Sequence, residues 1–132
     1  MSSETQYKEV IETRSATIAL DEDSIVHVTY RHVTVTVEDA KDQVAIYREL
    51  GNGQPVLRLV DMTQLISTDG EVRQYGVSPE TIAMTRAMAV ISNSFVSKML
   101  ANFFLKFNKP PFPVRLFTDK EEAIDWLKQF LD

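Results

Sequence analysis

Several hydroxyl groups follow a carboxylate at the end of an apolar run in the middle of the chain. Asp61 ends that run, and Thr63, Ser67 and Thr68 follow it before Gly70. A phosphate on a hydroxyl at a helix start would be stabilised by the free amides and by the helix dipole. Phosphorylation at Ser67 or Thr68 that switches partner binding is therefore one hypothesis. A turn and a helix cap explain the same two residues, and we favour that explanation because Ser and Thr lead the capping preference.

A second polar group, Ser92-Asn93-Ser94, comes directly after another apolar run. In open α/β sheets ligands collect at the carboxyl ends of the strands, where helix amides can hold an anion. We expect Asp61 and Thr63 to lie along the same edge, so these residues form a candidate anion-binding site. No glycine-rich phosphate loop accompanies them. An ordinary helix cap is the favoured explanation of residues 92–94.

Four phenylalanines, Phe103, Phe104, Phe107 and Phe112, lie close together in the C-terminal part of the sequence. Together with Trp126 they are candidates for the lining of an apolar ligand cavity, as in lipid carriers with a related arrangement of sheet and helices. Core packing explains them more simply, and a dimer interface is the next explanation. They are therefore candidate interface or apolar-ligand residues.

The sequence gives no positive sign of catalysis or of a metal site. His27 and His32 are the only histidines, and no local spacing supplies the further ligands that a metal would need. We expect them at the surface or on an edge strand. The acidic turn at residues 21–23 is too short for a calcium loop. Hydrolase and metalloprotease motifs are absent, so we predict a non-enzymatic protein without a cofactor.

These residues are positioned by strands and helices that alternate along the chain. Periodicity and turn residues predict strands at residues 16–20, 25–30, 56–61, 87–91 and 114–117. Capping residues predict helices from Thr36 to Leu50, in two short pieces opened by Thr68 and Ser78, from Phe95 to Phe107, and after the capping box of Thr118 and Glu121. The order predicts an α/β fold with a mixed, mainly parallel sheet of about five strands, an N-terminal β-hairpin and about four helices.

This order resembles the STAS or SpoIIAA-like fold, named from sulphate transporters and anti-sigma factor antagonists. The segment from Ala87 to Phe130 reads AMAVISNSFVSKMLANFFLKFNKPPFPVRLFTDKEEAIDWLKQF and is similar to the C-terminal half of small uncharacterised bacterial SpoIIAA-like proteins. The resemblance implies that the segment after Asp61 leads to a regulatory phosphorylatable serine. The Asp-Ser-Ser-Gly pattern of that serine is absent here, and the resemblance implies fold better than activity.

Composition limits the classes of partner and setting. With 132 residues and no cysteine, the chain is expected to be a single domain, 1–132, in a reducing cytoplasm. Residues 1–12 are either a loosely ordered terminus or an edge strand. The net charge of −5 argues against nucleic acid as the partner. We expect no secretory signal, because residues 1–6 have neither a basic start nor an apolar core. The helix at residues 95–107 is too short for an integral membrane segment.

The preferred hypothesis is a STAS-like protein-interaction or regulatory module that works through its sheet edge and the surface around residues 63–70. Its partner would be another protein or a second copy, in a homodimer, because the helix at residues 95–107 is apolar nearly all round. The alternative is a small apolar-ligand or lipid-binding protein that uses space between this helix and the sheet.

Overall fold

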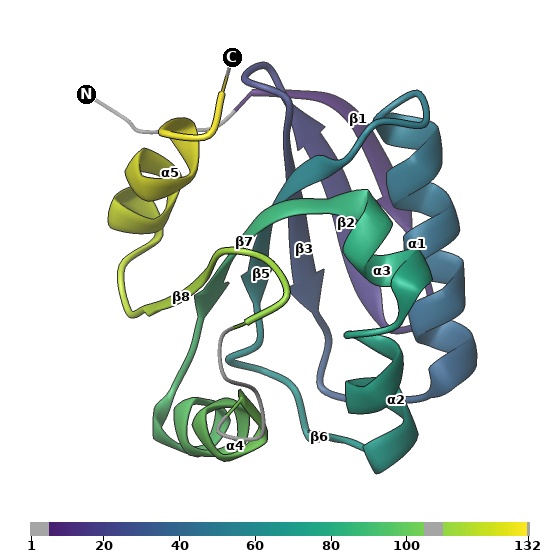
Figure 1. Cartoon of the computed structure of the whole chain (residues 1–132), viewed down its shortest axis with the longest axis vertical. Helices are drawn as coiled ribbons and strands as arrows, with labels where there is room; N and C mark the ends of the chain where they lie inside the picture. The colour runs from purple at the N-terminus through teal and green to yellow at the C-terminus, as the bar shows by residue number, and fades with distance from the viewer. Residues whose placement is uncertain (1–5, 105–109, 132) are drawn as a thin grey trace.

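The main sheet holds six strands within the described part of the chain, in the order β1-β2-β3-β5-β7-β8 (Figure 1). The computed structural model describes residues 6–104 and 110–131, with side chains for all of these except residues 101–104. The strands are β1 (Tyr7–Glu12), β2 (Ala16–Asp21), β3 (Ile25–Tyr30), β5 (Val56–Asp61), β7 (Thr85–Ile91) and β8 (Val114–Phe117). Pairing is antiparallel from β1 to β3 and parallel from β3 to β8, which confirms the mixed, mainly parallel sheet and the N-terminal hairpin.

Two short strands were not predicted, and β1 was expected only as the edge-strand alternative for residues 1–12, so the expected number of about five was too low. β1 forms the edge of the sheet, and its sequence YKEVIE is almost wholly exposed, so it lacks the alternation that marks a half-buried strand. β4 (Thr34–Val35) and β6 (Ser67–Thr68) form a separate parallel pair of two residues each. Two residues are too few to show any periodicity.

Five helices are present in the described part of the chain, where about four were expected. They are α1 (Val37–Leu50), α2 (Gly70–Tyr75), α3 (Pro79–Met84), α4 (Ser94–Phe104) and α5 (Lys120–Lys128). The two short pieces are separate helices, because Ser78 caps α3 and Pro79 occupies its first turn. The last helix begins after Asp119, whose carboxylate accepts a hydrogen bond from the amide of Glu121. The predicted cap at Thr118 is therefore wrong by one residue.

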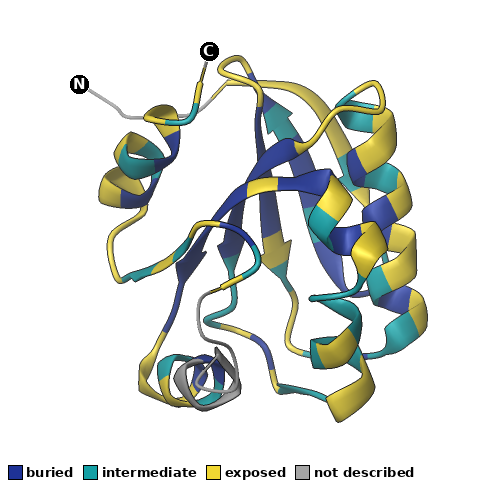
Figure 2. Ribbon diagram, viewed as in Figure 1, coloured by how far each residue is buried: buried dark blue, intermediate teal, exposed yellow. Residues whose placement is uncertain are grey.

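Helices cover both faces of the sheet (Figure 1). Val26, Val28 and Val60 point to the face covered by α1, α3 and α4, and Ile25 and Leu59 point to the face covered by α5. This split follows from the period of two along a strand. Figure 2 shows that β3, β5 and β7 are buried along most of their length. Their carboxyl ends point toward α4, β6 and α2 (Figure 1).

The start of α1 is fixed by a capping box that also binds an arginine. The Thr36 hydroxyl accepts from the amide of Asp39 at 3.2 Å, and the Thr36 amide donates to the Asp39 carboxylate at 2.9 Å. The guanidinium of Arg14, in the turn between β1 and β2, donates to the same carboxylate from Nε and Nη2. These hydrogen bonds hold the pKa of Asp39 below its usual range, with the bond from Arg14 as the largest cause.

Replacing Asp39 with Asn should lower the free energy of unfolding by about 2 kcal/mol at neutral pH, because a charged hydrogen-bond acceptor is lost. The folded pKa of Asp39 lies below its unfolded value of about 3.9. Its contribution is therefore present above the unfolded pKa and is lost as the pH falls through the folded pKa. Urea unfolding at neutral pH and at about pH 2 should show the difference between wild type and variant shrink at the lower pH.

The matched control is Asp42→Asn, at an exposed position of the same helix. It should stay within about 0.5 kcal/mol of the wild type at both pH values. A wild-type-to-Asp39→Asn difference that is the same at both pH values would contradict the role given to the carboxylate.

Candidate functional site

The polar residues at the carboxyl ends of β5 and β7 form one hydrogen-bonded group. The amide and the hydroxyl of Thr63 both donate to Asp61 Oδ1, at 2.9 and 2.7 Å. Asn93 Nδ2 donates to the Thr63 carbonyl at 3.2 Å, and Asn93 Oδ1 accepts from the amide of Val96 in the first turn of α4. The structure therefore brings Asp61, Thr63 and Asn93 together, and their bonds close a turn and cap a helix.

The two serines beside Asn93 have different environments. Ser92 is buried, and its hydroxyl lies 2.7 Å from the hydroxyl of Ser97 one turn into α4. Its amide donates to the carbonyl of Phe117 at the end of β8. Ser94 is the exposed first residue of α4. Of the three residues, only Asn93 and Ser94 face solvent.

Ser67 and Thr68 belong to a different group of side chains. The Ser67 hydroxyl lies 3.1 Å from the Thr34 hydroxyl of β4, across the β4–β6 pair. Thr68 accepts from Arg73 Nη1 at 2.9 Å, through both its hydroxyl and its carbonyl oxygen. The predicted Thr68 cap is wrong, because the carboxylate of Asp69 caps α2 by accepting from the amide of Val72. No hydrogen bond that the structure describes joins Ser67 or Thr68 to the group around Asp61.

His27 is buried in the sheet, so the expectation of a surface or edge position is wrong for this residue. It lies on the interior strand β3 with 5% of its surface exposed, and its Nε2 is 2.8 Å from Asp21 Oδ2. Burial raises the pKa of Asp21, but hydrogen bonds from His27 and from two backbone amides outweigh burial, and the pKa lies below its usual value. The Tyr7 ring of β1 meets the imidazole edge-on at 5.1 Å. His32 is exposed, as expected.

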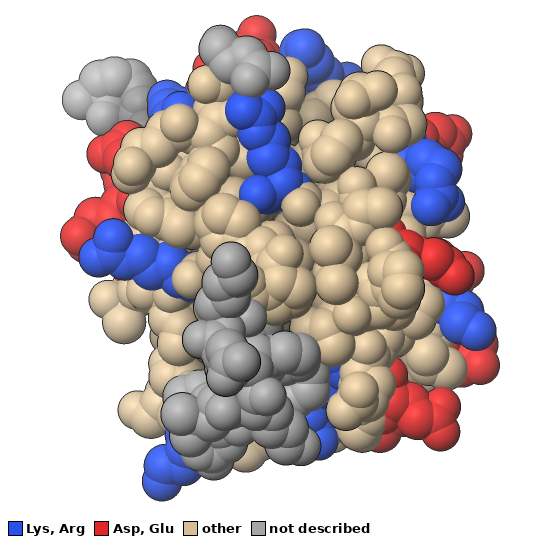
Figure 3. All heavy atoms as spheres, in the orientation of Figure 1, with Lys and Arg blue, Asp and Glu red and all other residues tan. Residues whose placement is uncertain are grey.

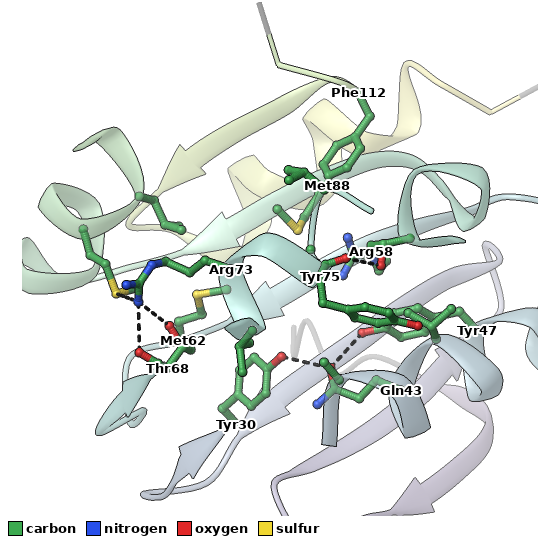
Figure 4. A pocket seen from close by; sticks show the side chains of 18 residues that line it. Tyr30, Gln43, Tyr47, Arg58, Met62, Thr68, Arg73, Tyr75, Met88 and Phe112 are labelled. Carbon is green, nitrogen blue, oxygen red and sulfur yellow. Dashed lines mark hydrogen bonds between the residues drawn. The ribbon is translucent and has the colours of Figure 1, made fainter. Parts of the chain in front are cut away.

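A cavity of about 110 Å³ lies between the sheet and the helices of the α1 face, and we call it the core cavity (Figure 4). The sheet contributes Met88 and helix α4 contributes Met99 and Leu100. Its apolar lining is formed by Ala40, Val44, Met62, Val72, Val77, Met88, Met99, Leu100 and Phe112. Of the phenylalanines predicted as apolar-ligand residues, Phe112 borders the cavity. The side chains of Phe103 and Phe104 and the whole of Phe107 lie outside the described residues.

A small hydrogen-bonded network forms part of the cavity wall. The hydroxyls of Tyr30 and Tyr47 both donate to Gln43 Oε1, at 2.9 and 3.2 Å (Figure 4). Gln43 Nε2 donates to the Ser15 hydroxyl. Burial raises the pKa of Tyr30 above its ordinary value. Its phenol therefore remains protonated and serves as a hydrogen-bond donor.

Arg58 places a positive charge beside the same cavity. It lies on the interior strand β5, next to Val26 of β3 and Met88 of β7 in the register, with 8% of its surface exposed. Its guanidinium lies over the ring of Tyr47 at 5.0 Å and 6.0 Å from the ring of Phe112. These contacts are cation–π interactions, so two aromatic rings face the buried charge.

The hydrogen bonds of this guanidinium are incomplete. Arg58 Nη2 donates to the Thr85 hydroxyl at 3.1 Å, and that hydroxyl donates in turn to the Thr81 carbonyl. Arg58 Nε is buried and has no hydrogen-bond partner. Sequence reasoning missed Arg58 because residues 56–61 were interpreted as one apolar strand. One feature of the sequence could have identified it. Arg58 is a charged residue within a strand that was predicted to lie inside a parallel sheet, where strands are buried on both faces.

The charged groups that line the cavity all have one sign. Arg73 of α2 lines it together with Arg58, and no Asp or Glu is among the described lining residues. Arg73 donates to Thr68 and approaches Met99 Sδ at 3.9 Å (Figure 4). The protein surface, unlike the cavity, carries charges of both signs. Lys and Arg alternate with Asp and Glu around the rim of the face in Figure 3. The cavity therefore has a basic character in an acidic protein.

The described part of the chain contains neither a candidate metal site nor a candidate membrane span. Nowhere in residues 6–104 and 110–131 do three His, Asp or Glu side chains gather in a way that could hold a metal ion. None of the helices in these residues has the length and apolar character needed to cross a membrane.

The structure is similar to the crystal structure of an uncharacterised DUF3478-family protein with a SpoIIAA-like fold from Shewanella loihica PV-4. The TM-score is 0.56 at 17% sequence identity, and the match covers 96% of this chain and 98% of that chain. At this identity the likeness shows the fold alone, and it confirms the predicted SpoIIAA-like architecture. Comparison with curated proteins gives no match.

A family model described as a domain of unknown function, DUF7793, matches residues 18–131. The match begins within β2 and runs past the end of α5. The chain therefore belongs to the DUF7793 family and adopts the SpoIIAA-like fold.

Proposed function

We propose that this protein binds a small, mainly apolar ligand in the core cavity. The observation that carries the proposal is the size of this space, about 110 Å³, inside the layer between the sheet and its helices. Natural cores contain few voids larger than a water molecule, whose share of liquid volume is about 30 Å³. An apolar cavity of about 150 Å³ is enough to bind benzene. A ligand of a few carbon atoms therefore matches the available space.

The kind of residue in the lining supports ligand binding. Met62, Met88 and Met99 all border the cavity, and methionine side chains adapt to different shapes because they are unbranched and polarisable. The described lining contains no Asp, Glu, His, Lys or Cys. Tyrosine and threonine hydroxyls are the groups of the lining that acid–base or nucleophilic catalysis could use, and each already has a hydrogen-bond partner within the protein. This supports binding rather than catalysis. The absence of cysteine supports a cytoplasmic setting.

Filling the cavity from α1 should abolish binding. Ala40 lines the cavity, so Ala40→Leu places extra carbon atoms in the space that a ligand would occupy. Titration of isotope-labelled protein with 1-pentanol, followed by amide chemical shifts, should give saturable shifts around the cavity in the wild type. Affinity should fall about tenfold or more in Ala40→Leu, because ligand and side chain compete for the same volume.

The matched control is Ala45→Leu, the same change at an exposed position of the same helix, and it should bind like the wild type. Thermal unfolding of both variants checks that they are folded. Non-saturable shifts in the wild type, or equal binding by Ala40→Leu and the wild type, would rule out the cavity as the binding site.

The second candidate function is the STAS-like interaction module. It is favoured by two large apolar side chains that are exposed to solvent, Ile66 at 46% and Phe95 at 58% exposure. They lie on the segments that the hydrogen bond between Asn93 and Thr63 holds together. Large apolar side chains exposed on adjoining segments are candidate protein–protein contacts. A second copy of the chain is the simplest partner.

If this surface forms a homodimer, Phe95→Ser should weaken self-association about tenfold or more, because large aromatic residues are frequent anchors of interfaces. Sedimentation equilibrium over a range of protein concentrations measures the change. Leu131→Ser, at another exposed apolar residue, is the control and should leave association unaltered. A wild type that is monomeric at high concentration would exclude the homodimer.

Regulation of such a module would use Thr68 or Ser67. Arg73 Nη1 already lies 2.9 Å from the Thr68 hydroxyl, so a phosphate there would gain a charge-assisted hydrogen bond. Protein purified from its cells should then contain a fraction with one added phosphate, detected by intact-mass analysis and lost in Thr68→Val. A native protein without phosphate under every growth condition would count against the switch.

A further inference from the structure

We propose that the ligand of the core cavity is a small monocarboxylic acid whose carboxylate binds Arg58. This inference rests on the proposed ligand-binding function and names the chemical class of the ligand. The apolar part of the acid would lie among the methionine and phenylalanine side chains of the lining.

The charged side chains in the described lining of the cavity are both positive. The chain has 19 acidic and 14 basic residues, yet the charged residues among the described lining are Arg58 and Arg73. Burying a cation is strongly unfavourable unless an anion or several acceptors compensate it. The hydrogen-bond acceptors that Arg58 and Arg73 reach are hydroxyl, carbonyl and thioether groups. Arg73 is only half-buried, so a ligand with a negative charge would chiefly supply the compensation that Arg58 lacks.

Arg58 also carries a hydrogen-bond donor without an acceptor. Its residue is 8% exposed, its Nη2 is bonded to Thr85, and its buried Nε has no partner. Tyr47 and Phe112 lie against the guanidinium, but their rings offer no oxygen or nitrogen acceptor in these contacts. An N–H group that is buried without an acceptor is rare in folded proteins. Nε is thus the donor left for a ligand oxygen, and, because the atom itself is buried, the guanidinium would turn in the cavity wall to present it.

The shape of the space selects a carboxylate rather than a larger anion. A carboxylate is planar and matches the edge of a guanidinium. A phosphate is more strongly hydrated and would need several further donors in this mainly apolar lining. The cavity of about 110 Å³ is smaller than the space of about 150 Å³ that holds benzene. The cavity is partly open to solvent, so its enclosed part would hold the carboxylate and about two or three carbons, and the end of a pentyl chain would extend into the opening.

The test compares probes of one length and different head groups on the full chain. Isotope-labelled protein is titrated with pentanoate, 1-pentanol and pentylamine, and dissociation constants are obtained from chemical shifts. Pentanoate should bind about tenfold tighter than 1-pentanol or better, because its head group makes a charge-assisted bond, and pentylamine should bind most weakly. The side-chain Nε–H signal of Arg58 should shift with pentanoate and stay in place with the alcohol.

Two variants test whether Arg58 causes the preference for pentanoate over 1-pentanol. Arg58→Met keeps an unbranched apolar side chain and removes a buried charge, which folded proteins often tolerate, and it should bind pentanoate no better than 1-pentanol. Arg115→Met, at an exposed residue of β8, is the matched control and should keep the preference. If Arg58→Met does not fold, the probe series and the Nε–H signal in the wild type decide the question.

The outcomes separate this inference from the function on which it rests. If 1-pentanol binds in the cavity and pentanoate binds no tighter, the ligand-binding function stands and the carboxylate inference is wrong. It is also wrong if the preference survives in Arg58→Met or is lost only in Arg73→Met. If no probe binds, the proposed function itself fails, and Arg58 has a structural role between Tyr47 and Phe112.

Discussion

Parallel pairing of β3, β5 and β7 is the constraint on which the rest of the structure depends. Interior strands of a parallel sheet are buried on both faces, so each needs apolar residues at successive positions and helices on both sides. In β5, Leu57 and Leu59 pack under α5, and Val56 and Val60 pack under the helices of the other face. The placement of the connecting helices follows, because α1 leads from β3 to β5, α2 and α3 lead from β5 to β7, and each connection must return across the sheet. The last helix, α5, follows β8 and covers the opposite face.

Arg58 is the departure from this constraint. It occupies a position of β5 at which the pattern demands an apolar side chain, on the face covered by α1. Two aromatic rings and the Thr85 hydroxyl compensate part of the buried charge. The orphan Nε shows that the compensation is incomplete. Natural proteins retain such locally unfavourable groups most often where function uses them, which is the physical reason for centring the candidate site on this residue.

Local signals predicted most of the architecture. The hairpin of β2 and β3 and the helix starts at Thr36 and Ser78 each depend on residues a few positions apart, and all three were predicted. β1 was not predicted as a definite strand, because its pairing with β2 leaves its side chains in solvent. The burial of His27 was missed as well, since it depends on Asp21 and Tyr7 from neighbouring strands.

The candidate site could not be predicted from the sequence alone. By itself the sequence determined the α/β class, the SpoIIAA-like order of elements and the helix-capping turn of Ser92 to Ser94, because periodicity and capping are local properties. Only the tertiary structure decided that Arg58, Arg73 and Phe112 border one cavity. These residues come from β5, from α2 and from the segment before β8. They come together only when the helices pack on the sheet. Their spacing along the chain does not predict that they lie close in space.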